Sequence, residues 1–275
     1  MMTVGIRKLG FGCSRLGSLG GIGKRESRDL LEWSASQGVR FFDTAATYGQ
    51  GDSERFLGEL LRAHPSLMVA TKVGKVSPTK SKMMSLLKEP LRLLVRKVPI
   101  LRSMVVRTRG GELPTCFSTN YLETQLKSSF KRLGVLKIPI VFLHNPSSEV
   151  IDKGNAIEFL DSYRKEGRIG MVGVSVSDYE DGRAALRDAR VGAVQIPFFD
   201  TEEFGDFLQA AKEVNKFVVV REVMKGIEAV AKNDKEPFLR SRLSVLVSNQ
   251  NIDIVLIGTT KRAHLAEILT VFKHL

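Results

Sequence analysis

Residues 38–61 read GVRFFDTAATYGQGDSERFLGELL, and they show the pattern that recurs along the chain. A short apolar run, RFFD (40–43), is followed by a longer segment in which apolar and polar residues alternate with helical spacing. Eight such apolar runs occur, at residues 8–13, 40–43, 67–72, 138–144, 169–175, 191–196, 216–222 and 252–258. Helical spacing is clear in ESRDLLEWSASQG (26–38) and in NYLETQLKSSFKRLG (120–134), which ends on glycine. Strands are therefore predicted to alternate with helices.

Each run is nearly continuously hydrophobic, which is typical of a parallel sheet covered by helices. Eight βα units in 275 residues predict a single-domain (β/α)8 TIM barrel over residues 1–275, with a doubly wound sheet as the main competitor. The glycine-rich stretch GSLGGIGKRE (17–26) favours the barrel, because it lacks the spacing of a dinucleotide-binding turn and of a P-loop. We expect it to form a flexible loop.

Composition excludes several classes of protein. With 43% hydrophobic and 26% charged residues, the chain has the material for a buried core and is not a disordered tail. Two cysteines, Cys13 and Cys116, are too few for a disulfide framework or a zinc site, and no metal is expected. The first residues, MMTVGIRKLGFG, contain no signal-peptide run, and no stretch reaches the ~18 apolar residues of a spanning helix. A cytoplasmic protein is expected.

The net charge of +12 is concentrated in one segment. Residues 75–115 carry ten basic and two acidic side chains, a net charge of +8, which leaves +4 for the other 234 residues. This segment is predicted to be a basic insertion after the third strand. It contains no aromatic residue for base stacking, so we expect no nucleic-acid binding. Two interpretations stay open: a lid over the pocket, or a docking surface for an anionic membrane or substrate.

The ends of the runs carry distinctive side chains, and the carboxyl ends of barrel strands are where active sites form. An acid, a phenol, an amine and an imidazole are predicted to converge there: Asp43, Tyr48, Lys72 and His144. A carboxylate at the end of an apolar strand needs a cationic partner, and Lys72 on the adjacent strand is the obvious one. An ammonium beside a phenol favours its ionisation, so this group of residues forms a proton donor for a carbonyl oxygen. Further polar or glycine positions end the later runs: Ser175, Gln195, Arg221 and Gly258.

These residues and the segments around them resemble the aldo-keto reductase family. The likeness is carried by residues 38–61 and, in order, by ATKVG, VFLHNP, RKEGRIGMVGVS, VGAVQIP and VLIGTTKRAHLAEI. It covers nearly the whole chain apart from about residues 77–115. The resemblance implies a reductase of aldehydes or ketones that uses NADPH (NADP+), usually a monomer or a weak homo-oligomer. Tyr48 would be the general acid, Lys72 and Asp43 would tune it, and His144 would orient the carbonyl group.

The resemblance also implies a cofactor site. Ser175 and Gln195 match residues that hold the nicotinamide carboxamide, and Arg221 is assigned to the same site. A second group matches the loop and helix start around the adenosine phosphate: Gly258, Thr259, Thr260, Lys261, Arg262, His264 and Glu267. Hydroxyls and two cations at a helix N-terminus suit a 2′-phosphate, which favours NADPH over NADH. Val176 and Ile268 depart from the family pattern, since both replace a common asparagine.

Two other functions remain as alternatives. The family includes potassium-channel β subunits whose main role is partner binding, so a cofactor-binding regulatory subunit with weak reductase activity is the second candidate. A hydrolase built from Ser175, His144 and Asp43 is discounted, because the chain lacks the G-x-S-x-G turn that exposes a serine nucleophile.

Overall fold

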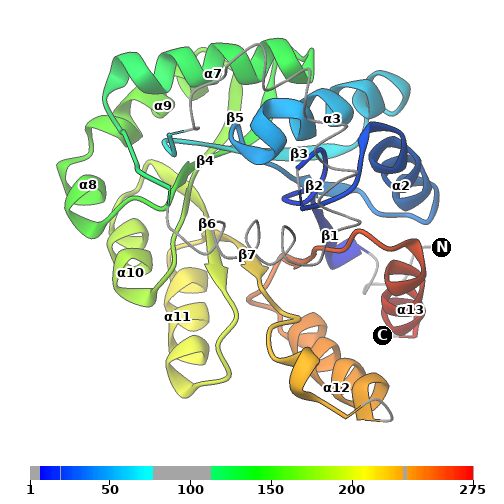
Figure 1. The fold of residues 1–275 in the computed structure, drawn as a ribbon. Coiled ribbons are helices and arrows are strands. Elements are labelled where there is room, and N and C mark those ends of the chain that lie inside the picture. The colour runs from blue at the N-terminus through cyan, green and yellow to red at the C-terminus, as the bar shows by residue number, and fades with distance from the viewer. Residues whose placement is uncertain (1–6, 19, 77–112, 232–233, 275) are drawn as a thin grey trace.

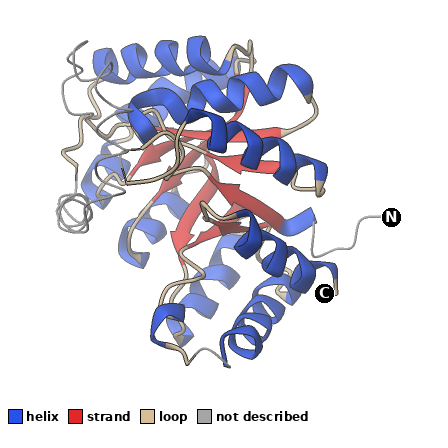
Figure 2. Ribbon diagram, turned by 45° about the vertical axis from the view of Figure 1, so that its right-hand side comes forward, coloured by secondary structure: helices blue, strands red, loops and turns tan. Residues whose placement is uncertain are grey.

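The computed structural model describes residues 7–18, 20–76, 113–231 and 234–274. In this part of the chain eight parallel strands close into a barrel in sequence order, with the first strand pairing with both the second and the eighth. Helices surround the barrel on its outside (Figures 1 and 2). The strands are β1 (Leu9–Gly12), β2 (Phe41–Asp43), β3 (Met68–Val73), β4 (Ile138–His144), β5 (Ile169–Ser175), β6 (Val191–Pro197), β7 (Phe217–Arg221) and β8 (Ile254–Ile257). The predicted single-domain (β/α)8 barrel is confirmed, and each predicted run coincides with one strand, although β3 and β6 extend one residue beyond their runs.

The helices follow the strands as the spacing predicts. The described α-helices are α2 (Lys24–Ser36), α3 (Asp52–Ala63), α7 (Thr119–Leu133), α8 (Ser148–Lys153), α9 (Asn155–Lys165), α10 (Tyr179–Arg187), α11 (Glu202–Glu213), α12 (Lys235–Ser248) and α13 (Arg262–Lys273). Two short 3-10 helices, η1 (Tyr48–Gly51) and η2 (Ile227–Ala229), follow β2 and β7. α7 stops at Gly134, whose φ of 68° is left-handed, so the predicted glycine stop is confirmed.

The core has two layers because successive side chains of a strand point to opposite faces. The larger layer lies between strands and helices; α2, for example, buries Leu30, Leu31 and Ala35 in it. The smaller layer fills the barrel interior and consists of Phe41, Ala70, Ile140, Phe142, Ala193, Val219, Ile254 and Leu256. Gly173 makes room inside the barrel, since a Cβ at that position would collide with the ring of Phe142. The interior is therefore a packed core, and only its ends are open to function.

A buried ion pair ties β3 to two of the outer helices. Glu54 of α3 is completely buried, and its carboxylate accepts hydrogen bonds from Arg132 Nε of α7 at 2.5 Å and from the Thr71 hydroxyl of β3 at 2.6 Å. Each carboxylate oxygen thus has a partner, as a buried charge requires. The contact fixes the strand that carries Lys72 against α3 and α7.

Backbone hydrogen bonds connect the two ends of the predicted basic insertion. The Val76 N–H donates to the Pro114 carbonyl at 2.7 Å, and the Cys116 N–H donates to the Gly74 carbonyl at 2.7 Å. The two ends of the segment therefore lie side by side just after β3. Residues 77–112 lie outside the described residues, so the insertion at 75–115, as a lid or as an anionic-surface contact, stays a prediction.

Candidate active site

The period of two along each strand gathers polar side chains at one end of the barrel interior. Three predicted residues each stand two positions after an interior apolar residue: Asp43 after Phe41, Lys72 after Ala70, and His144 after Phe142. Gln195 follows Ala193 and Arg221 follows Val219 in the same way. All these positions lie toward the carboxyl ends of their strands, although β6 continues two residues beyond Gln195. The strands thus bring side chains from five parts of the sequence to one rim.

Asp43 and Lys72 form a buried ion pair. Lys72 Nζ lies 2.6 Å from Asp43 Oδ1 and 2.5 Å from Oδ2, and it also donates to the Thr44 carbonyl at 3.1 Å. Asp43 is 4% exposed and Lys72 is 2% exposed. The ammonium has three N–H donors and three acceptors close by, so its hydrogen-bonding capacity is filled by β2 and the residue that follows it.

Tyr48 lies between this ion pair and His144. Its ring, on η1, has Lys72 Nζ 5.2 Å from the centroid, in a cation–π arrangement. The ring of His144 meets it edge-on, with the centroids 6.0 Å apart and the planes at 87°. The structure therefore brings together all four residues of the predicted proton-donating group. The Lys72 ammonium thus faces the ring of Tyr48, while its N–H groups are directed at oxygen atoms of Asp43 and Thr44.

His144 sits in an environment that disfavours its charged form. Burial, followed by the positive charges of Lys72, Lys75 and Arg221, holds the pKa of His144 well below its ordinary value of 6.5. Its Nδ1 atom is buried and has no hydrogen-bond partner among the described residues. The imidazole is therefore neutral near pH 7. Because an unpaired buried N–H is costlier than an unpaired acceptor, the neutral ring is best protonated at Nε2.

Cys13 lies directly beside the ion pair. Its backbone N–H donates to the Asp43 carbonyl at 2.8 Å, and its side chain is completely buried. Burial and the negative charge of Asp43 raise the pKa of the Cys13 thiol well above its ordinary value, against the opposing effect of Lys72. A thiol that stays protonated and buried is a poor nucleophile. Cys13 is thus a packing residue at the end of β1.

A chain of hydrogen bonds crosses the barrel behind the rim. The Ser175 hydroxyl donates to Gln195 Oε1 at 3.0 Å, and Gln195 Nε2 donates to Asp43 Oδ1 at 2.9 Å. Ser175 is 4% exposed and Gln195 is completely buried. Two residues predicted to contact a cofactor are therefore connected to the Asp43–Lys72 pair. The sequence offers no signal for this connection, because β6 and β2 are not neighbours in the barrel.

Arg221 reaches across the rim from β7. Its Nη2 donates to the Val176 carbonyl at 2.8 Å, at the end of β5, and its guanidinium pairs with the adjacent Glu222. Burial lowers the pKa of Arg221 from its ordinary value, while Tyr48 and Asp43 act in the opposite direction. A guanidinium stays charged under such a shift. Arg221 therefore adds a positive charge to the rim that holds His144.

Left-handed backbone occurs next to the rim side chains. Four described residues other than glycine have positive φ; three of them follow rim residues closely: Gln50 at 61° after Tyr48, Asn145 at 61° after His144, and Glu222 at 61° after Arg221. Such backbone costs of order 1–3 kcal/mol per residue and is concentrated at functional sites. Asn145 is further tied to the next strand, since its N–H donates to the Ser175 carbonyl at 2.7 Å and its Oδ1 accepts from the Ser177 hydroxyl at 2.6 Å. Asn145 and Glu222 are not among the predicted site residues; for Asn145, an asparagine directly after a predicted strand was the available signal of left-handed backbone.

The second predicted cofactor group lies where β8 leads into α13. Gly258 directly follows β8, and Thr259 Oγ1 accepts a hydrogen bond from the Lys261 N–H at 3.1 Å. Arg262 begins α13, and its guanidinium lies 4.5 Å from the centroid of the Trp33 ring on α2. The other members are exposed or half-buried: Thr260, His264 and Glu267. Residues 258–261 therefore form the loop between β8 and α13, whereas the Arg262 side chain points toward Trp33 of α2.

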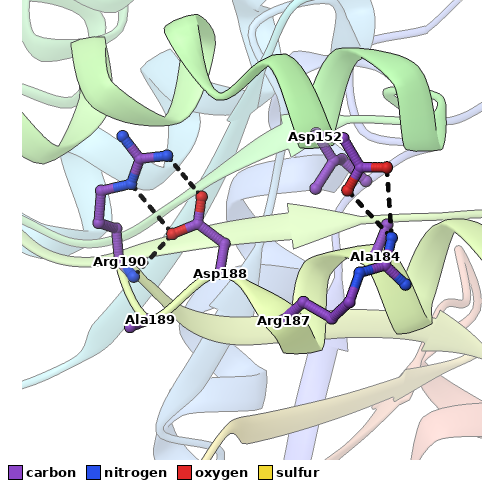
Figure 3. Close-up of a pocket in the computed structure, with 7 residues that line it drawn as sticks. Asp152, Ala184, Arg187, Asp188, Ala189 and Arg190 are labelled. Carbon is purple, nitrogen blue, oxygen red and sulfur yellow. Dashed lines mark hydrogen bonds and ion pairs between the residues drawn. The ribbon is translucent and has the colours of Figure 1, made fainter.

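A hollow of about 320 Å³ lies away from this rim, between α8, α10 and the turn before β6 (Figure 3). Two ion pairs line it: Arg187 Nη2 with Asp152 Oδ1 at 3.0 Å, and Arg190 Nη2 with Asp188 Oδ2 at 2.6 Å. It lies at the amino end of β6, whereas Tyr48 and His144 lie at the carboxyl ends of their strands. With both guanidinium groups held by carboxylates, the hollow offers no unpaired charge to a ligand.

Two further searches concern only the described ranges. Within them, no cluster of three or more histidine, cysteine, aspartate or glutamate side chains has the geometry to hold a metal ion. Nor does any described helix combine the length and apolar character needed to cross a membrane.

Comparison with known proteins points to one family. The model of the aldo/keto reductase family matches residues 8–199. D-threo-aldose 1-dehydrogenase from a Pseudomonas species is 26% identical over 203 residues, which cover 70% of this chain and 56% of that protein. Pyridoxal 4-dehydrogenase from Microbacterium luteolum is 24% identical over 253 residues, 85% of this chain and 72% of that protein. The chain thus spans little more than half the length of the first of these relatives.

A solved structure shares the fold. The aldo-keto reductase from Klebsiella pneumoniae in complex with NADPH has a TM-score of 0.66 and 14% sequence identity, with 96% of this chain and 85% of that chain covered. The family model spans most of the barrel, from β1 to just beyond β6, and includes all four residues of the rim group. The chain belongs to the aldo/keto reductase family.

Proposed function

We propose that the protein reduces an aldehyde or ketone to an alcohol with NADPH. The observation that carries this proposal is the arrangement of Tyr48, with the Lys72 ammonium over its ring and the neutral His144 at its edge. A phenol between a buried cation and an imidazole donor is suited to protonating a carbonyl oxygen. The small-molecule carbonyl compound would enter at the carboxyl ends of the strands.

The polar groups of the rim fit a nicotinamide cofactor. At the β8–α13 junction the first N–H groups of a 12-residue helix lie beside the Thr259 hydroxyl and the exposed Lys261, a set of donors suited to phosphate. Ser175, Gln195 and Arg221 stand on the strands nearer the catalytic group and would hold the nicotinamide end. The aldo-keto reductase from Klebsiella pneumoniae, which shares the fold, was solved in complex with NADPH, and this supports the choice of cofactor.

Each residue of the rim group has a distinct role in the proposed reaction. A bound NADPH supplies the hydride that the carbonyl carbon receives. Tyr48 donates its hydroxyl proton to the carbonyl oxygen, which completes the alcohol and leaves a phenolate. The Lys72 ammonium, held by Asp43, stabilises that negative charge across the ring face. His144, protonated at Nε2, donates a hydrogen bond that orients the carbonyl oxygen before the transfer.

Single-turnover oxidation of bound NADPH by a reactive aldehyde tests this proposal. We expect Tyr48→Phe to slow the step by about 100-fold or more, the range of general acid catalysis, with little change in NADPH affinity. Tyr163→Phe is the matched control, because Tyr163 is a buried tyrosine on α9 that packs against Phe159 and Phe130 away from the rim. If wild type and Tyr48→Phe oxidise the cofactor equally slowly, the reductase proposal is wrong and a cofactor-binding regulatory role gains support.

A further inference from the structure

Gln195 makes an unusual contact for a residue on β6. The barrel closes in the order β1 to β8, so β2, which carries Asp43, lies four strands away in either direction. The side chain of Gln195 nevertheless reaches Asp43, with Nε2 2.9 Å from Oδ1. It therefore spans the interior just above the apolar layer that contains Phe41 and Ala193.

The orientation of the Gln195 amide is fixed by its neighbours. A carboxylate can only accept hydrogen bonds, so the atom that faces Asp43 must be the NH2 group. On the other side, the Ser175 hydroxyl donates to Oε1 at 3.0 Å, which requires the carbonyl oxygen there. Both ends of the amide are thus satisfied inside the protein, and the side chain is completely buried.

The hydrogen bond from Gln195 adds to those that Lys72 donates to the Asp43 carboxylate. Oδ1 accepts from both Lys72 Nζ and Gln195 Nε2, and Oδ2 accepts from Lys72 Nζ. The carboxylate is thereby held from opposite sides of the barrel, by β3 and by β6. Because Lys72 is directed by Asp43, the position of its ammonium relative to the Tyr48 ring depends on where Asp43 is held.

We infer that Gln195 is a positioning residue for the catalytic group: it holds Asp43 from across the barrel and, through Lys72, sets the cation beneath Tyr48. This inference rests on the proposed reductase function and gives Gln195 a role in addition to its proposed contact with the cofactor. Ser175 takes part by fixing the Gln195 amide in the orientation that donates to Asp43.

Gln195→Met removes the donor while keeping the length of the side chain. At saturating NADPH we expect the rate of the hydride-transfer step to fall about 10- to 100-fold, the effect of losing one hydrogen bond to a charged group. Gln209→Met, on the exposed surface of α11, is the matched control and should leave this rate unchanged. An unchanged rate at saturating NADPH, whatever the change in the Kd for NADPH, would show that Gln195 serves only cofactor contact and overturn the inference.

Gln195→Glu gives a pH signature that a merely structural role would not produce. A protonated carboxyl at this position can donate to Asp43 as the amide does, whereas an ionised one repels it. We expect this variant to regain activity at low pH and to lose it as pH rises. Gln195→Met should not show this pH dependence of activity. An introduced carboxyl that left the pH profile like that of wild type would contradict the inference.

A stability measurement separates this inference from the proposed function. Beside Asp43, the introduced carboxyl would have a folded-state pKa above its unfolded value of about 4.3. The folded state then binds the extra proton, so the stability of Gln195→Glu relative to wild type must decrease as pH rises above that unfolded value. Thermal unfolding at pH 5 and pH 8 tests this even if no substrate is turned over. A pH-independent difference in melting temperature from wild type would show that residue 195 does not face Asp43.

Discussion

Removal of the Lys72 ammonium is the perturbation whose effect on stability the structure defines best. In Lys72→Met the Asp43 carboxylate, which is 4% exposed, loses two of its three hydrogen bonds and keeps only the one from Gln195. Breaking a buried ion pair on one side costs about 3–5 kcal/mol, because the remaining charge is uncompensated. Asp43→Leu leaves the ammonium with only the Thr44 carbonyl and should cost a similar amount.

The double variant Lys72→Met/Asp43→Leu should be more stable than either single variant. Replacing both charges with apolar side chains above the interior layer is often neutral or stabilising. The Gln195 amide then loses its partner, which costs about 1–3 kcal/mol. We therefore expect the double variant to lie about 1–3 kcal/mol below wild type and to be inactive, which would show that the ion pair serves catalysis more than stability.

Urea unfolding followed by far-ultraviolet circular dichroism and by the fluorescence of Trp33, the chain's one tryptophan, measures these free energies. Lys153→Met is the matched control, because Lys153 forms an exposed ion pair with Glu149 and should leave the free energy of unfolding unchanged. Single variants within 1 kcal/mol of wild type, or effects of the two substitutions that simply add, would contradict a strongly coupled buried ion pair.

Two other expectations follow from shifted pKa values. Since the pKa of folded His144 lies below the unfolded value of 6.5, the folded state binds fewer protons, and wild type should lose stability as pH falls from about 6.5. Melting temperatures at pH 7.5 and 5.5 should therefore differ less in His144→Asn than in wild type; an equal difference would contradict a depressed pKa. Burial raises the pKa of the Cys13 thiol, whereas a hydrogen bond with Ser118 lowers that of the half-buried Cys116. Titration of the native protein with a thiol reagent should then show one fast-reacting thiol, absent in Cys116→Ser, and rapid modification of both thiols would count against the buried position of Cys13.

Much of the fold is encoded locally. A run such as IPIVFLH (138–144) is apolar at nearly every position because both faces of its strand are covered, so strand, burial and parallel pairing can all be inferred from it. The period of two then places a polar residue near the end of a run on the interior face. Their place at or just after the carboxyl ends of the runs predicted Asp43, Tyr48, Lys72 and His144 as neighbours that form a proton donor, and a resemblance to a family supplied the cofactor.

The sequence could not indicate contacts that depend on closure of the barrel. Nothing local relates Gln195 to Asp43, which are 152 positions apart and on opposite strands, or Arg262 to the ring of Trp33. Nor does the sequence show that Lys72 faces the ring of Tyr48, or that burial and three cations keep His144 neutral. The sequence determined which side chains reach the rim, because strand periodicity is local. Only the tertiary structure decided their partners and their charge states, because hydrogen bonds and desolvation depend on every strand that surrounds them.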